Sequence, residues 1–120
     1  MKGLCAVALF SFLALAPACS SGGEDLPTVD CKSGSIPTYA EIKTAGLAKC
    51  TTCHSSQVTG AGRVAAPDSV NFDTYAAAKA EAKQAAIEVN EGAMPPAGSP
   101  DPSDAEKEAL YKWALCGTPE

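Results

Sequence analysis

Apolar residues recur at helical spacing in three stretches of the chain, residues 37–50, 71–92 and 103–117. No stretch alternates apolar and polar residues as a half-buried strand would, so the pattern predicts an all-α protein with three main helices. The apolar positions that fall on one face of each stretch are Tyr39 and Ile42 in the first, Tyr75, Ala78, Ala82, Ala85 and Val89 in the second, and Leu110, Trp113 and Ala114 in the third.

A few residues predict where these helices begin. Pro37 suits the first turn of the first helix, and Asp73 can cap the second. Ser103 and Glu106 have the spacing of a capping box at the start of the third. Gly46 is unfavourable inside a helix, which indicates a position where another element approaches closely.

The predicted helices do not supply a large core. The middle helix would bury mostly alanine, and two long segments rich in Gly, Pro and Ser, residues 55–70 and 93–102, connect the helices. A small domain with few large apolar side chains should be only marginally stable. Long loops are also unusual in a compact domain unless they surround something. Both features predict a large apolar group at the centre of the fold.

The N-terminus is typical of an exported protein. Lys2 precedes an apolar run from Leu4 to Leu15, and small residues follow. A membrane-spanning helix would need about 20 apolar residues, and Pro17 comes too early for one. We therefore expect a signal peptide over 1–18, a flexible tether over 19–30 and one domain over 31–120.

Cys19 at the expected cleavage point resembles the first mature residue of a bacterial lipoprotein, which carries the lipid anchor. Such signals usually have Leu three residues earlier, where this chain has Ala16. The alternative is ordinary cleavage, which would leave a plain N-terminal cysteine. We expect an exported protein that is either periplasmic or attached to a membrane through Cys19.

Charge and compartment narrow the possible partners. The chain has a net charge of −5 and no cluster of basic residues, so nucleic acid is not an expected partner. An exported protein lies in an oxidising compartment, where cysteines serve as bridges or attachment points.

The segment CTTCH places Cys50, Cys53 and the only histidine of the chain, His54, together. Cys-x-x-Cys-His is the attachment signature of c-type haem. Two thiols one helical turn apart can form thioether bonds to one edge of a porphyrin, and the adjacent imidazole can then ligate the iron. A zinc site would need a second ligand pair, a thioredoxin-like dithiol would need a βαβ context, and a simple Cys50–Cys53 disulfide is the plainest alternative.

The remaining cysteines, Cys31 and Cys116, bracket the expected domain. Cys5 leaves with the signal peptide, and the other three have the roles given above. A bridge between Cys31 and Cys116 is therefore expected, with two separate free thiols as the alternative.

Residues 36–116 resemble a small class I-type c-type cytochrome domain. The resemblance rests on CTTCH at the end of the first helix, GAMPP after the second and LYKWALCG in the third. It implies a cytochrome c-like fold whose helices and long loops wrap one covalently attached haem. It also implies that Met94 is the second axial ligand, that Gly46 packs against the Leu110–Trp113 face, and that a proline carbonyl, for which Pro67 is a candidate, bonds the axial histidine.

The resemblance implies an electron carrier rather than an enzyme, with one haem c, His54/Met94 ligation, redox partner proteins and a monomeric state. Pro95 and Pro96 stiffen the loop that holds Met94, although a loop methionine can also merely fill a gap. The alternative is a gas-binding sensor or peroxidase-like enzyme with an open sixth position. A third possibility is a binding module in which the haem is purely structural.

Overall fold

The computed structural model describes residues 25–120, and in this range it contains three α-helices, two short 3-10 turns and no strand. The all-α prediction is therefore confirmed. The helices are α1 (Tyr39–Thr44), α2 (Tyr75–Asn90) and α3 (Asp104–Leu115). The expected signal peptide over 1–18, the lipid site at Cys19 and the first part of the tether lie outside the described residues.

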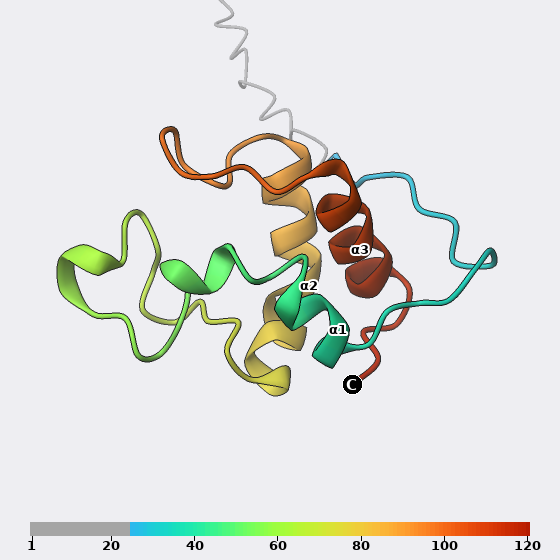
Figure 1. Cartoon of the computed structure of the whole chain (residues 1–120), viewed down its shortest axis with the longest axis horizontal. Helices are drawn as coiled ribbons and strands as arrows, with labels where there is room; N and C mark the ends of the chain where they lie inside the picture. Colours follow the sequence, from blue (N-terminus) through green and yellow to red (C-terminus); the bar gives the residue numbers. More distant parts are fainter. Residues whose placement is uncertain (1–24) are drawn as a thin grey trace, which may run out of the picture.

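The three helices form one packed group, in which α3 contacts both α2 and α1 (Figure 1). Their shared core is small, and α2 contributes mainly alanine to it, as the sequence predicted. Trp113, Ile42, Leu47 and Leu110 are the largest side chains that are fully buried. None of the helices formed by residues 25–120 has the length and apolar character that a membrane crossing requires.

The first helix is shorter than the sequence pattern predicted. Thr38 is extended and caps α1 through a capping box with Glu41, so Pro37 precedes the helix instead of opening it. The helix stops at Thr44, because Ala45 leaves the helical region with φ −117° and ψ −92°. The chain then forms a turn and a 3-10 segment, Cys50–Thr52.

Gly46 explains this interruption. A Cβ atom at Gly46 would lie 2.9 Å from the Glu106 carbonyl oxygen and 3.2 Å from the Leu110 Cβ. The backbone at Gly46 therefore packs directly on α3, which only glycine allows. The predicted close approach at this residue is confirmed. Because of it, the first helix is not continuous through residue 50.

Of the caps predicted for the other two helices, the one for α2 was wrong and the one for α3 is confirmed. Thr74, not Asp73, caps α2, and its side chain accepts from the Ala77 amide. The Asp73 carboxylate accepts instead from the Ser56 amide and hydroxyl, at 3.1 and 2.6 Å. The Ser103–Glu106 capping box of α3 is present.

Both ends of the described chain are fixed to the helices. Cys31 and Cys116 form a disulfide, the pairing expected from the sequence, with Cα atoms 5.4 Å apart. The Pro119 carbonyl accepts from the Tyr39 amide at 2.8 Å and from the Trp113 indole at 2.9 Å. At the start of the described range, the Asn90 side chain donates to the Asp25 carbonyl at 2.8 Å. The segment before α1 and the two long loops lie outside the helical group (Figure 1).

Candidate functional site

The CTTCH segment forms a tight turn that brings its three reactive side chains to one cavity. The amides of Cys53 and His54 both donate to the Cys50 carbonyl, at 3.2 and 2.8 Å. This turn places both thiols and the imidazole among the residues that line the cavity.

The cavity has a volume of about 370 Å³, within the range of small-molecule and cofactor sites. The CTTCH turn, α2 and the two long loops surround it. Figure 1 shows both loops extending to the same side of the helical group. The loops contribute apolar groups, including Val64, Val70, Pro95 and Pro96. The two long loops, whose length the sequence alone did not explain, thus enclose this cavity.

Both thiols of the turn are free, so the Cys50–Cys53 disulfide alternative does not hold in this structure. Burial raises the pKa of the Cys50 thiol to about 11, and the nearby Glu106 charge acts in the same direction. The thiolate is the reactive form in disulfide exchange, so a raised pKa does not suit a redox-active dithiol. Both free thiols line the cavity and are available there as attachment points.

His54 is held at both its ring and its backbone. Its Nδ1 atom lies 3.1 Å from the Val70 carbonyl oxygen. A carbonyl only accepts, so Nδ1 carries a proton, and in the neutral ring Nε2 has the lone pair that can bind a metal. The Phe72 ring meets the imidazole edge-on at 5.4 Å between centroids, and the Phe72 amide donates to the His54 carbonyl at 2.9 Å. The imidazole is therefore oriented as metal-bound histidines are.

The carbonyl that bonds His54 belongs to Val70, and the expectation for Pro67 was wrong. The Pro67 carbonyl is taken by a guanidinium nitrogen of Arg63 at 2.6 Å. It also accepts from the Val70 amide at 3.0 Å, in a turn that brings Val70 to the imidazole.

Sequence reasoning missed Arg63, which does not line the cavity itself but donates to the carbonyls of Pro67 and Val70, two residues that do. It is only 9% exposed, yet it carries the only guanidinium of the chain. The sequence offered one signal for its burial. Arg63 stands alone among Gly, Ala and Val, with few charged neighbours in its loop.

Met94 reaches the same cavity from the loop that follows α2. The amides of Ala93 and Met94 both donate to the Glu88 carbonyl, at 2.9 and 3.0 Å, which fixes the start of the loop on the end of α2. The Met94 side chain is partly buried against the helical core. The structure thus brings the four predicted haem-binding residues, Cys50, Cys53, His54 and Met94, to one cavity.

An ion pair braces the CTTCH turn against α3. The Lys49 ammonium lies 2.8 Å from a Glu106 carboxylate oxygen and donates to the Asp101 carbonyl at 3.0 Å. The Lys49 hydrogen bond, followed by the Ser103 amide, lowers the pKa of Glu106 to about 2. Glu106 therefore stays ionised across the physiological range.

Two carboxylates that the sequence analysis did not assign also line the cavity. Glu81 and Glu88 lie on the face of α2 that borders it, together with Gln84 and Ala85. Gln84 donates from Nε2 to a Glu88 carboxylate oxygen at 2.8 Å. The cavity is thus mainly apolar with a polar margin on α2.

The residues present fit a covalently attached haem. They offer two free thiols three residues apart, an imidazole with Nε2 free, and a thioether on the loop after α2. A histidine and a methionine together form the ligand pair of many electron-carrying c-type haems. Among residues 25–120 no three His, Cys, Asp or Glu side chains gather as the protein ligands of a single bare metal ion would.

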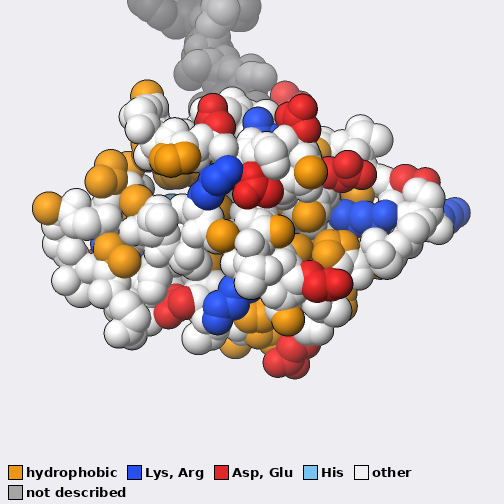
Figure 2. All heavy atoms as spheres, in the orientation of Figure 1, with side chains coloured by type: hydrophobic (Ala, Val, Ile, Leu, Met, Phe, Trp, Pro, Cys, Tyr) orange, Lys and Arg blue, Asp and Glu red, His pale blue; other side chains and the backbone are white. Residues whose placement is uncertain are grey.

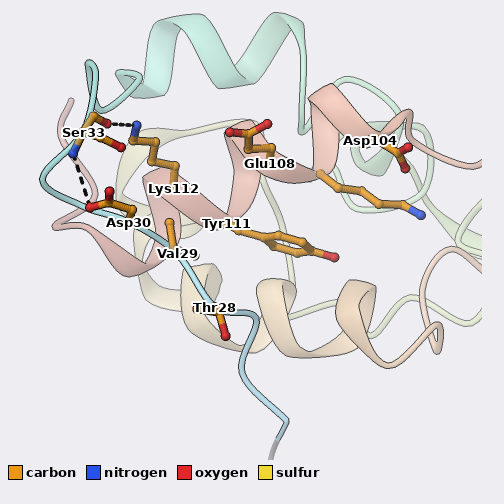
Figure 3. Close-up of a pocket in the computed structure, with 9 residues that line it drawn as sticks. Thr28, Val29, Asp30, Ser33, Asp104, Glu108, Tyr111 and Lys112 are labelled. Atoms are coloured by element: carbon orange, nitrogen blue, oxygen red, sulfur yellow. Dashed lines mark hydrogen bonds between the residues drawn. The ribbon is translucent and has the colours of Figure 1, made fainter.

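A second cavity of about 350 Å³ lies between residues 28–33 and α3 (Figure 3). The Lys112 ammonium donates to the Ser33 carbonyl there, and the Ser33 amide donates to Asp30 at 3.3 Å. Its lining has neither a thiol nor an imidazole.

On the face drawn in Figure 2, acidic side chains are scattered among single basic ones.

One comparison with known proteins identifies a related family. The family model described as "Cytochrome C oxidase, cbb3-type, subunit III" matches residues 38–113, which is more than half of the chain. No curated protein and no solved structure shows a significant similarity to this chain. The matched range begins at the cap of α1, ends at Trp113 and includes the whole lining of the 370 Å³ cavity.

Proposed function

This chain belongs to the cytochrome c family described as subunit III of the cbb3-type oxidase, and on that premise we propose that it is a monohaem electron carrier. Domains of this family work by haem-based electron transfer. The main observation in support of this proposal is that Cys50, Cys53, His54 and Met94 line the same cavity. The single CTTCH segment supports one haem for each chain.

Each residue has a distinct role in this proposal. The thiols of Cys50 and Cys53 would form the thioether links to a haem, and His54 Nε2 and the Met94 sulfur would ligate its iron. A haem bound in this way supplies a one-electron Fe(III)/Fe(II) couple. The chain contributes the hydrogen bond that orients the imidazole, the apolar lining that excludes water, and a thioether that favours the reduced state.

The alternative is a gas-binding sensor or peroxidase-like enzyme, in which the sixth position is open. Glu81 and Glu88 favour keeping this candidate, because they are acidic groups at the cavity that an enzyme could use. Met94 on the same cavity favours the electron carrier. The two proposals therefore differ in whether Met94 occupies the sixth position.

A redox titration of the purified wild-type protein tests the proposed function. We expect one reversible step that fits a single-electron couple, with the visible spectrum changing from ferric to ferrous c-type haem. A protein whose haem cannot be reversibly reduced would be a structural-haem module, and this result would contradict the proposal.

We further propose that the protein is exported and held at a membrane by lipid on Cys19, that it acts as a monomer, and that its partners are redox proteins. Domains of this family are generally extracytoplasmic. Wild-type protein should sediment with membranes, and Cys19→Ser should release it while leaving the haem spectrum unchanged. A wild-type protein that is already fully soluble after cell fractionation would instead indicate plain secretion.

A further inference from the structure

Arg63 and His54 share one hydrogen-bond acceptor. The Val70 carbonyl oxygen lies 3.1 Å from His54 Nδ1 and 3.0 Å from one terminal nitrogen of the Arg63 guanidinium. A carbonyl oxygen has two lone pairs and can accept both bonds at once. The buried positive charge of Arg63 is thus linked to the expected axial ligand, His54, through a single carbonyl group.

The guanidinium is also the centre of the loop that carries this carbonyl. A buried charge must be fully hydrogen-bonded, and Arg63 donates to six acceptors at 2.6–3.3 Å within residues 55–71. These are the carbonyls of Ser55, Val58, Ala66, Pro67 and Val70 and the side chain of Asn71. The loop therefore holds its shape around this one side chain.

The charge of Arg63 is only weakly compensated. Its carboxylate partner, Asp68, lies 3.2 Å from Nε, but the Asp68 side chain is 99% exposed. Water and salt screen an exposed carboxylate, so it offsets little of the buried positive charge. All of the other partners are neutral.

We propose that Arg63 is a positioning residue for His54 that raises the reduction potential of the bound haem, an inference that rests on the proposed function. By donating to the Val70 carbonyl, Arg63 draws electron density from it and weakens it as an acceptor for Nδ1–H. The imidazole is then a poorer electron donor through Nε2, which favours Fe(II) over Fe(III). The buried positive charge acts in the same direction.

The sign of the effect separates this role from a merely structural one. Loosening of the loop alone would weaken the His54–Val70 bond, reduce the basicity of the imidazole and raise the potential. Loss of the Arg63 charge and of its bond to the shared carbonyl lowers the potential. We expect Arg63→Gln to lower it by about tenfold in the redox equilibrium constant, or ~59 mV for one electron.

Two further variants define the cause. Arg63→Lys keeps the charge but cannot form the fork of bonds, so its potential should fall between wild type and Arg63→Gln. Lys43→Gln removes one positive charge whose ammonium bonds the Asp73 carbonyl and not Val70, and it should leave the potential nearly unchanged. An Arg63→Gln potential at or above wild type overturns the proposal, as does an equal fall in Lys43→Gln or an Arg63→Lys potential equal to wild type.

A measurement on the wild-type protein keeps the proposal testable if the variants do not take up haem. In the ferrous protein, proton NMR should show a nuclear Overhauser effect between the His54 Nδ1 proton and the Arg63 guanidinium protons. Resolved guanidinium signals without this effect would overturn the shared acceptor. A wild-type protein without covalent haem would instead contradict the proposed function, so the two failures are distinguishable.

Discussion

Replacing Cys50 and Cys53 together by serine is expected to abolish covalent haem attachment, because no other pair of thiols lines the 370 Å³ cavity. Acid-acetone extraction of the exported variant should leave no haem with the protein, whereas the wild-type haem should resist extraction. The helical group should also lose stability, since a small alanine-rich core would surround a largely empty apolar space.

The double variant Cys31→Ser/Cys116→Ser is the matched control. It removes two cysteines that do not line the cavity. Its haem should still resist extraction even if the domain unfolds more easily. Haem that is extracted equally from wild type and from both double variants would refute attachment through the CTTCH segment.

Replacing Met94 by alanine is expected to open the sixth coordination position. A thioether is a soft ligand that prefers Fe(II), so its loss should lower the reduction potential by on the order of 100 mV, within the ≈0.8 V range that axial ligands span. The near-infrared band of methionine–iron ligation should vanish. The ferrous variant should bind carbon monoxide readily near neutral pH, whereas the wild type should resist it.

Pro95→Ala is a useful comparison, because it alters the stiffness of the loop beside Met94 and leaves the sulfur in place. It should keep the near-infrared band. If wild-type ferrous protein binds carbon monoxide quickly and fully, Met94 does not close the site, and the sensor or enzyme proposal takes precedence over electron transfer.

Local sequence signals sufficed where a single residue type has one physical role. The capping box at Ser103 and Glu106 follows from their spacing alone, and the need for glycine at position 46 follows from the helix penalty that it carries. The convergence of Cys50, His54 and Met94 followed from the Cys-x-x-Cys-His spacing and the family resemblance, together with the unexplained long loops.

Features that depend on tertiary contacts were not accessible in this way. The sequence pattern alone continued the first helix through Ala45, where the backbone turns away so that Gly46 can pack on α3. Asp73 suited a helix cap, but Ser56, which is distant in sequence, takes its carboxylate.

The details of the site were hidden for the same reason. Whether Pro67 or Val70 bonds the imidazole depends on how the loop folds around Arg63. The burial of that arginine follows only when the acceptors of residues 55–71 are arranged in space. Likewise, the place of Glu81 and Glu88 at the cavity depends on how the two long loops lie over that face of α2.

The most direct test of the central claim is the mass of the peptide that contains residues 50–54, released by proteolysis of the exported wild-type protein under denaturing conditions. The account predicts that this peptide is heavier than its bare sequence by one haem, with both cysteines unavailable to thiol reagents. A peptide of bare sequence mass, with two thiols that react freely, would contradict it.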